Sequence, residues 1–125
     1  MCQVDDFFVK ANDYGIITSS NYPNWTPNEI CTKLITAPVG YVIRVYINDY
    51  SIADVNRTTE KCDNEYLVLN SGESVRTYCG VRTKNGNNVF ESSSNELLIQ
   101  YKTSSLNNGQ YRGFNFYFES KNKLF

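Results

Sequence analysis

Short runs in which apolar and polar residues alternate recur along the whole chain, separated by residues that favour turns. The clearest runs are Tyr41–Ile52, Asn95–Thr103 and Arg112–Ser120. In the first of them, Ile43, Val45 and Ile47 occupy every second position. A period of two places such side chains on one face of a β-strand. No stretch of ten residues shows the 3.6-residue period of a helix, so the pattern predicts an all-β protein.

Nine strands follow from these runs and from the Gly, Asn, Ser and Pro residues between them. They are Asp6–Val9, Gly15–Ser19, Cys31–Thr36, Tyr41–Ile52, Glu65–Asn70, Val75–Cys79, Asn88–Glu91, Asn95–Thr103 and Arg112–Ser120. Each apolar face has to bury against a second sheet, because one open sheet would leave the chain without a core. The predicted fold is an antiparallel β-sandwich or jelly roll.

Length and charge limit the classes of function. A chain of 125 residues forms one domain with its own core. The formal net charge is −1 and no block of like charges occurs, which gives little support for nucleic-acid binding. No stretch approaches the roughly 20 apolar residues that a membrane span needs.

The four cysteines, Cys2, Cys31, Cys62 and Cys79, stand far apart. The C-x-x-C spacing of zinc and redox sites is missing, and the chain contains no histidine. Four thiolates could still bind zinc, but wide spacing in a tyrosine-rich β chain favours disulfides and an oxidising compartment. Spacing alone leaves three ways to pair four cysteines.

Two glycosylation sequons agree with a secreted or extracellular protein: Asn24-Trp25-Thr26 and Asn56-Arg57-Thr58. The first is compromised by its bulky Trp25 and by the following Pro27. Met1 stands directly before Cys2 without a signal peptide. We therefore expect an expression start on a segment of a larger secreted protein.

A series of motifs in a fixed order resembles a CUB domain over nearly the whole chain. After Cys2, Gly15-Ile16-Ile17-Thr18-Ser19 and Asn21-Tyr22-Pro23 look like the family's G-x-I-x-S-P-x-Y-P motif. The later motifs are Cys31, Pro38-Val39-Gly40, Cys62 with Glu65-Tyr66-Leu67-Val68-Leu69, Cys79-Gly80, Asn95–Tyr101 and Gly113-Phe114. Each is weak by itself, and all of them in order are specific.

The resemblance implies a jelly-roll β-sandwich with the disulfides Cys2–Cys31 and Cys62–Cys79. Residues 1–120 would form the CUB-like domain, and 121–125 a C-terminal tail. In a chain-entropy model each bridge would contribute roughly 3–4 kcal/mol to stability.

Catalysis is not expected. Without histidine, Ser-His-Asp and Cys-His arrangements are impossible, and disulfides would leave no cysteine free as a nucleophile. The acids that could form carboxylate pairs are Asp5, Asp6, Asp49, Asp54, Asp63 and Glu65. They stand in predicted loops or strand ends without another catalytic signature. We interpret them as solvated charges and predict that the chain is not an enzyme.

Calcium is the cofactor that the resemblance brings into question, because many CUB domains hold Ca²⁺ with three carboxylates. The position three residues after the third cysteine is Glu65, but the other two positions are Ala53 and Ser104. We therefore expect no tight calcium site and no cofactor. A shifted site built from Asp54, Asp63 and Glu65 is the alternative. Calcium-holding CUB domains also receive a partner's lysine on these acids, and that mode of recognition is not expected here.

Tyrosine side chains are the candidates for contact with a partner, because tyrosine buries area and keeps a polar tip. The candidates are Tyr46, Tyr50, Tyr66, Tyr111 and Tyr117. The competing interpretation is that each packs in the core or covers its rim. Four basic residues could form at most a weak surface for sulfated sugars: Arg76, Arg82, Lys84 and Lys102.

These features together predict an extracellular, non-catalytic module that binds a protein partner through its loops or a sheet face. We expect it to be one domain of a larger mosaic protein. Two other interpretations stay open. One is a free-standing, spermadhesin-like protein that binds carbohydrate or glycosaminoglycan. The other is a calcium-dependent adhesion module that uses the shifted acidic loop.

Overall fold

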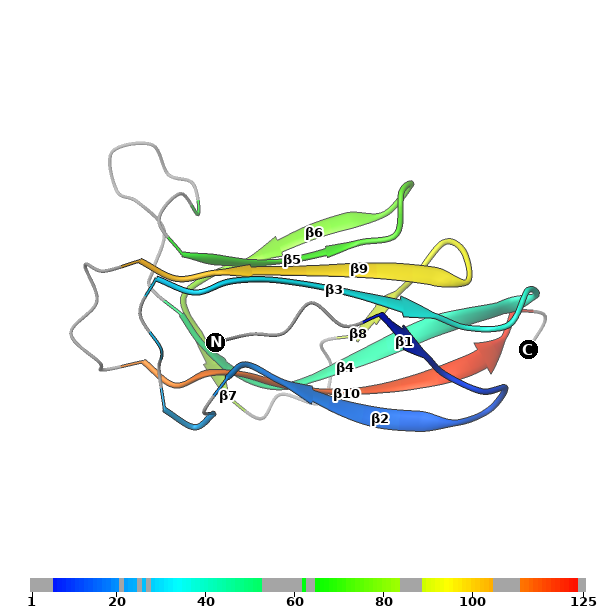
Figure 1. Cartoon of the computed structure of the whole chain (residues 1–125), viewed down its shortest axis with the longest axis horizontal. Helices are drawn as coiled ribbons and strands as arrows, with labels where there is room; N and C mark the ends of the chain where they lie inside the picture. Colours follow the sequence, from blue (N-terminus) through cyan, green and yellow to red (C-terminus); the bar gives the residue numbers. More distant parts are fainter. Residues whose placement is uncertain are drawn as a thin grey trace.

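Two β-sheets lie face to face in the computed structural model of the chain (Figure 1). The structure describes residues 6–20, 22–24, 26, 28–52, 62, 65–83, 89–104 and 111–123, with only the backbone at 81–83. Within these ranges all regular structure is strand, and no helix is present that could span a membrane. The predicted all-β sandwich is therefore confirmed.

The first sheet, sheet A, has the strand order β1-β3-β9-β5-β6. Its strands are β1 (Phe7–Phe8), β3 (Ile30–Thr36), β9 (Glu96–Lys102), β5 (Tyr66–Asn70) and β6 (Val75–Tyr78). All neighbours are antiparallel except β1 and β3, which are parallel.

The second sheet, sheet B, has the order β2-β10-β4-β7, and β8 also pairs with β4. Its strands are β2 (Tyr14–Thr18), β10 (Gly113–Asn122), β4 (Tyr41–Ser51), β7 (Val81–Thr83) and β8 (Val89–Glu91). One edge of the long strand β4 is shared between β8 and β7.

Each of the nine predicted strands corresponds to an observed strand whose ends differ by two residues at most. The sequence pattern missed β7, because three residues directly after Gly80 are too short a run to show alternation. β10 continues to Asn122, two residues beyond the predicted end of that strand.

The core lies between the sheets and is formed by alternate residues of each strand. Phe114, Phe116 and Phe118 of β10 are each at most 2% exposed, as the alternation predicted. Burying one such ring contributes roughly 1.5–3 kcal/mol. Sheet A supplies the facing layer with Ile35, Leu67, Leu69, Leu97 and Ile99.

β4 contains one extra residue, Asn48, which has no partner in β10. Ile47 and Asp49 lie opposite consecutive residues of β10, so the strand bulges between them. The bulge moves the inward positions from odd to even numbers, because a period-two pattern shifts with one residue. Tyr50 therefore points into the core and packs against Tyr78, while Asp49 stays on the outer side.

A disulfide joins Cys62 to Cys79, as predicted. It ties the segment before β5 to the end of β6 across 17 sequence positions. Cys31 is also a disulfide-bonded cysteine, and its predicted partner Cys2 lies outside the described residues.

Candidate functional site

The outer face of sheet B carries a row of apolar and aromatic side chains that crosses four strands. The pairing register places Ile16, Tyr117, Tyr46 and Val89 side by side on β2, β10, β4 and β8. Ile16 is 67% exposed, and the two tyrosines are half-buried. The row exists because the neighbours along each strand face the core. These four residues are called the tyrosine row below.

Tyr117 is the centre of an aromatic cluster on this face. Its ring lies 5.6 Å from the ring of Tyr46 and 5.7 Å from that of exposed Tyr14, measured between centroids. Cross-strand aromatic pairs contribute roughly 0.2–1 kcal/mol each. Desolvation, followed by the charge of Glu119, raises the pKa of the Tyr117 phenol. The phenol therefore stays neutral at physiological pH.

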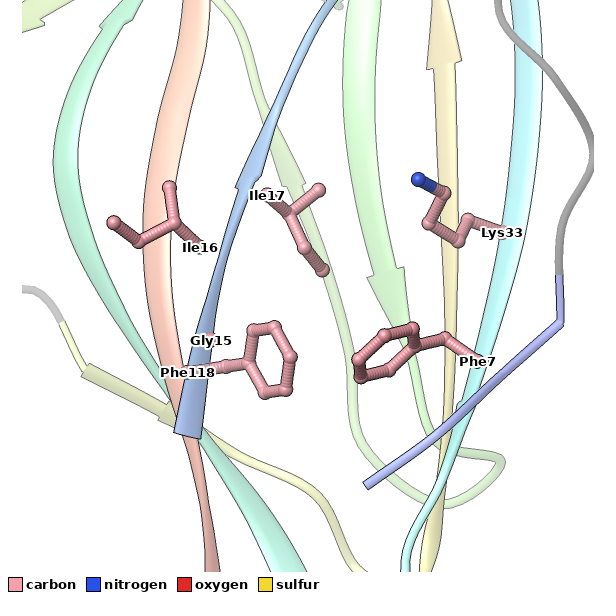
Figure 2. Close-up of a pocket in the computed structure, with 6 residues that line it drawn as sticks. All are labelled: Phe7, Gly15, Ile16, Ile17, Lys33 and Phe118. Carbon is pink, nitrogen blue, oxygen red and sulfur yellow. The ribbon is translucent and has the colours of Figure 1, made fainter. Parts of the chain in front are cut away.

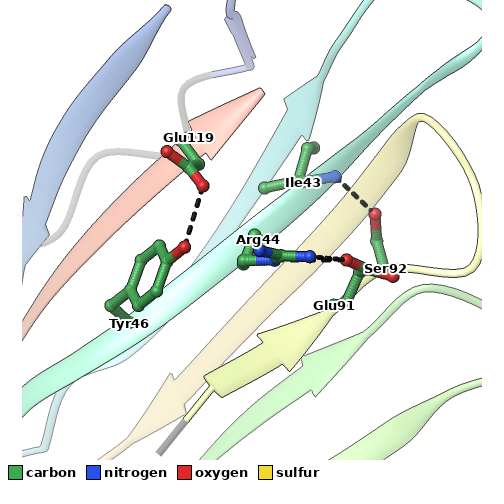
Figure 3. Close-up of polar contacts among 6 residues, drawn as sticks. All are labelled: Ile43, Arg44, Tyr46, Glu91, Ser92 and Glu119. Atoms are coloured by element: carbon green, nitrogen blue, oxygen red, sulfur yellow. Dashed lines mark hydrogen bonds and ion pairs between the residues drawn. The ribbon is translucent and has the colours of Figure 1, made fainter. Parts of the chain in front are cut away.

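A charged row runs beside the tyrosine row and consists of Glu119, Arg44 and Glu91 on β10, β4 and β8 (Figure 3). Arg44 donates to Glu91 from Nη2 at 2.8 Å and from Nε at 3.2 Å. Tyr46 Oη donates to Glu119 Oε1 at 2.8 Å. The hydrogen bond with Glu91 raises the pKa of Arg44. Such exposed pairs contribute little to stability but fix the side chains in place.

β8 is anchored to β4 beside this charged row. The backbone N–H of Ile43 donates to Ser92 Oγ at 2.7 Å, and the N–H of Ser92 donates to the Ile43 carbonyl at 2.9 Å (Figure 3). Ser92 is buried. The exposed end of the face is thus held by two buried hydrogen bonds, which are shielded from water.

The chemistry of this face is that of binding. It offers an apolar, aromatic strip with hydroxyl tips next to charged side chains. Aromatic residues are enriched in the cores of protein interfaces, and charged residues at their rims.

A second polar cluster lies at the end of sheet B where β10 begins. Arg112 donates to Asp49 from Nη2 to Oδ1 at 2.8 Å and from Nε to Oδ2 at 3.2 Å. The hydroxyl of Tyr22 also donates to Asp49 Oδ2. Burial by itself would raise the pKa of Asp49, but the hydrogen bonds from Arg112 and Tyr22 outweigh it and lower the pKa. The cluster holds three chain segments together.

Two glutamates are buried at one end of the core. Glu29 is 4% exposed and Glu65 is 1% exposed. Burial first, and then the charges of both glutamates, raise the pKa of Tyr101, so both carboxylates lie within electrostatic reach of its hydroxyl. Neither carboxylate oxygen of Glu29 has a hydrogen-bond partner within the described chain.

Glu65 is the one position of the predicted calcium triad that remains acidic, and within the described part of the chain Ser104 hydrogen-bonds to its carboxylate. Ser104, at another of the three predicted positions, donates to Glu65 Oε2 from its N–H at 2.9 Å and its hydroxyl at 3.3 Å. A donor therefore faces the carboxylate where a further anionic ligand would be needed. The described part of the chain contains no group of three metal-binding side chains. Ala53, Asp54 and Asp63 lie outside it.

The structure brings two of the five candidate tyrosines together and places the other three elsewhere. Tyr46 and Tyr117 lie on the outer face of sheet B. Tyr66 lies on sheet A, where its ring centroid is 6.0 Å from the Nζ atom of Lys102. Tyr50 was a candidate for partner contact, but it is 8% exposed because the bulge turns it inward, in agreement with the competing interpretation that it packs in the core. Half-buried Tyr111 precedes β10.

The remaining predicted positions are scattered. Asn24 is exposed and follows β2, and Arg76 is exposed on β6. Several positions lie outside the described residues: Asp5, Asn56 and Lys84, together with the side chain of Arg82. Sequence reasoning missed Tyr14 and Ile16, although both occupy outward positions of an alternating strand.

A model of the CUB domain family matches residues 2–118. The chain is a CUB domain. The resemblance predicted from the sequence motifs is thereby confirmed.

Relatives of this CUB domain are parts of larger proteins. Rat cubilin is 30% identical over 115 residues, which cover 85% of this chain and 3% of cubilin. The extracellular region of zebrafish Gpr126/Adgrg6 matches with a TM-score of 0.75 at 22% identity, covering 94% of this chain and 15% of that one. The calcium-bound CUB2 domain of MASP-1 matches with a TM-score of 0.73 at 21% identity, covering 94% and 98%. These two solved structures share the fold of this chain.

Proposed function

We propose that this CUB domain is an extracellular, non-catalytic module that binds a partner protein through the outer face of sheet B. The observation that carries the proposal is the tyrosine row, with Tyr117 packed between Tyr14 and Tyr46. The likeness to the extracellular region of zebrafish Gpr126/Adgrg6 supports the location. The small share of cubilin that the chain spans supports a place within a larger mosaic protein.

The partner surface follows from the chemistry of this face. Ile16 and Val89 offer exposed apolar area at the two ends of the row. The charged row carries two carboxylates and one guanidinium, and Arg44 is already paired with Glu91. An apolar patch with a lysine or arginine at its rim would therefore complement this face.

The test starts from proteins that the immobilised domain captures from extracellular fluid of its source, with and without EDTA. A captured protein is then purified, and its affinity is measured for the wild type and for Tyr117→Ala. We expect Tyr117→Ala to weaken binding at least tenfold, because a central aromatic residue usually dominates an interface. The matched control is Tyr66→Ala, which removes another half-buried tyrosine from sheet A.

Unchanged affinity of Tyr117→Ala for every purified partner would refute the sheet B face as the docking surface. Loss of binding in Tyr66→Ala would move the surface to sheet A. Capture that disappears with EDTA would instead indicate metal-dependent recognition. Circular dichroism of each variant shows that the fold is intact.

A further inference from the structure

A groove opens along one side of the sandwich, between β2 of sheet B and strands β1 and β3 of sheet A (Figure 2). Its volume is about 190 Å³, enough for a leucine-sized or ring-sized group. In Figure 2 the rings of Phe118 and Phe7 face each other across the gap, and Ile17 and Lys33 lie further along it. Phe7 is 47% exposed although its ring contacts Phe118 edge-on at 5.8 Å. The groove therefore keeps apolar area in contact with water.

Gly15 shapes the floor of the groove. It lies directly opposite Phe118 in the β2–β10 register. A Cβ atom on Gly15 would come within 2.6 Å of the Phe118 ring. The missing side chain therefore lets the ring lie against the strand and form the floor.

Within the part of the chain that the structure describes, the strand that borders the groove has an unpaired edge. β2 stands at the end of sheet B. The N–H of Ser19 donates to the Phe114 carbonyl at 3.1 Å, and the N–H of Ser120 to the Asp13 carbonyl at 2.8 Å. Because antiparallel pairs alternate, the odd-numbered residues of β2 bond to β10. The backbone groups of Ile16 and Thr18 point away from it.

Along this edge, the backbone N–H at one end of β2 already has a hydrogen-bond partner, whereas the middle of the strand has no neighbouring strand among those described. The N–H of Tyr14 already donates to Asp13 Oδ1 at 2.9 Å. Ile16 is the central residue of the strand, and no described strand pairs with it on this side. An exposed strand edge of this kind is a template for a further strand.

Lys33 supplies the only charge among the residues that line the groove. It lies on β3 between buried Cys31 and Ile35, so its position is on the inward side of sheet A. Neither ion pair of the described residues includes Lys33. A carboxylate entering the groove would complement it.

We propose that the β2 edge binds an extended segment of a partner protein in which an acidic and an apolar residue stand two positions apart. The residue between them exchanges N–H and C=O hydrogen bonds with Ile16. The apolar side chain, opposite Gly15, enters the groove and packs against the contacting rings of Phe118 and Phe7. The acidic side chain, opposite Ile17, meets Lys33. Two residues of a strand span about 6.6 Å, which suits two side chains in one groove.

The rival explanation is that Lys33 guards the edge, since inward-pointing charges prevent strands from adding to a sheet. The two explanations predict opposite effects of Lys33→Ala. Removing a guard strengthens edge binding, whereas removing a recognition group weakens it. The open groove with exposed Phe7 favours the explanation that Lys33 recognises a partner segment. A strand edge that is only protected against the addition of another strand does not require a cavity beside it.

The test uses the full chain and a capped, fluorescent peptide, Thr-Glu-Thr-Leu-Thr-Glu-Thr, whose pattern reads the same in both directions. We expect saturable binding that Lys33→Ala weakens at least fivefold and Lys33→Glu at least tenfold. Ile16→Pro removes an N–H that points away from β10, so the sheet persists and binding is lost. Its matched control, Ile16→Thr, keeps the N–H and is expected to bind within threefold of the wild type.

A second peptide, N-methylated at its leucine neighbours, separates strand addition from simple apolar contact, and we expect it not to bind. Equal binding of both peptides would overturn the proposal, as would stronger binding to Lys33→Ala. A wild-type dimer in sedimentation that Ile16→Pro abolishes would assign the edge to a second copy instead. Tyr117→Ala is expected to bind the peptide normally, so this result is independent of the proposed function.

Discussion

Arg112 and Asp49 stand 63 positions apart and are joined by two hydrogen bonds, of 2.8 Å and 3.2 Å. The pair ties the residue before β10 to the end of β4. Arg112 is 38% exposed at its side chain and Asp49 14%, so water screens one side of the pair. Tyr22 adds a third segment through its hydroxyl.

The first prediction concerns the pH dependence of this pair. The pKa of Asp49 is lower in the folded state than its ordinary value, so its stabilisation is present above the unfolded pKa. It is lost as the pH falls through the folded pKa. Asp49→Asn is expected to lower the free energy of unfolding by about 1 kcal/mol at pH 7. Urea denaturation from pH 7 to pH 2 should show the difference from wild type vanish on the acid side.

A difference that stays constant over the whole pH range would contradict this origin. Arg112→Lys is the companion variant, because it keeps the charge and removes the forked geometry. Its loss of stability should also disappear at low pH.

Gly113 is expected to be intolerant of a side chain. Its φ is +94°, and a Cβ atom would lie 2.0 Å from Ser19 Oγ, which accepts the N–H of Phe114. Gly40 has nearly the same φ, +92°, but open space around the Cβ position. We expect Gly40→Ala to cost about 1 kcal/mol and Gly113→Ala about 3 kcal/mol or more. Equal losses in chemical denaturation would show that the backbone angle alone decides.

The Cys62–Cys79 disulfide closes a loop of 17 positions. Replacing both cysteines by serine is expected to lower the free energy of unfolding by about 3 kcal/mol. Thermal and urea denaturation of the double variant measure the loss. The single variant Cys79→Ser should lose at least as much and leave one free thiol. A stability equal to that of the wild type would mean that the bridge is dispensable.

Calcium is expected to have no effect on stability. Ser104 donates two hydrogen bonds to Glu65 where a further acid would be needed to hold the ion. Calorimetric titration with CaCl₂ should show no low-micromolar binding, and the melting temperature should be the same in EDTA and in calcium. Binding to the folded state would raise that temperature. Such a rise, abolished by Asp54→Asn or Asp63→Asn, would establish the shifted acidic site.

The alternation of apolar and polar residues within single strands accounts for the part of the fold that could be predicted from the sequence. Phe114, Phe116 and Phe118 alternate with polar residues, and this spacing alone indicates a strand with one buried face. The order of motifs around the cysteines then indicated the family. Strand β7 was not predicted, because its three residues are too few to show an alternation.

The candidate site was harder to predict, because the register between strands decides it. Tyr46 and Tyr117 become neighbours only through the β4–β10 pairing, and Tyr14 joins them through β2. The sequence equally suggested Tyr50, since nothing local indicates that a bulge at Asn48 turns it inward. The partners of Asp49 lie 27 and 63 positions away, beyond any local signal.

The extra residue in β4 also bears on comparison with relatives. In a CUB domain that lacks a counterpart of Asn48, the core tyrosine would stand one place earlier relative to Ile47. A gapless alignment would then match that buried ring to Asp49, a surface carboxylate. The gap belongs inside the strand, and placing it in the following loop would exchange interior and exterior positions for the last third of β4.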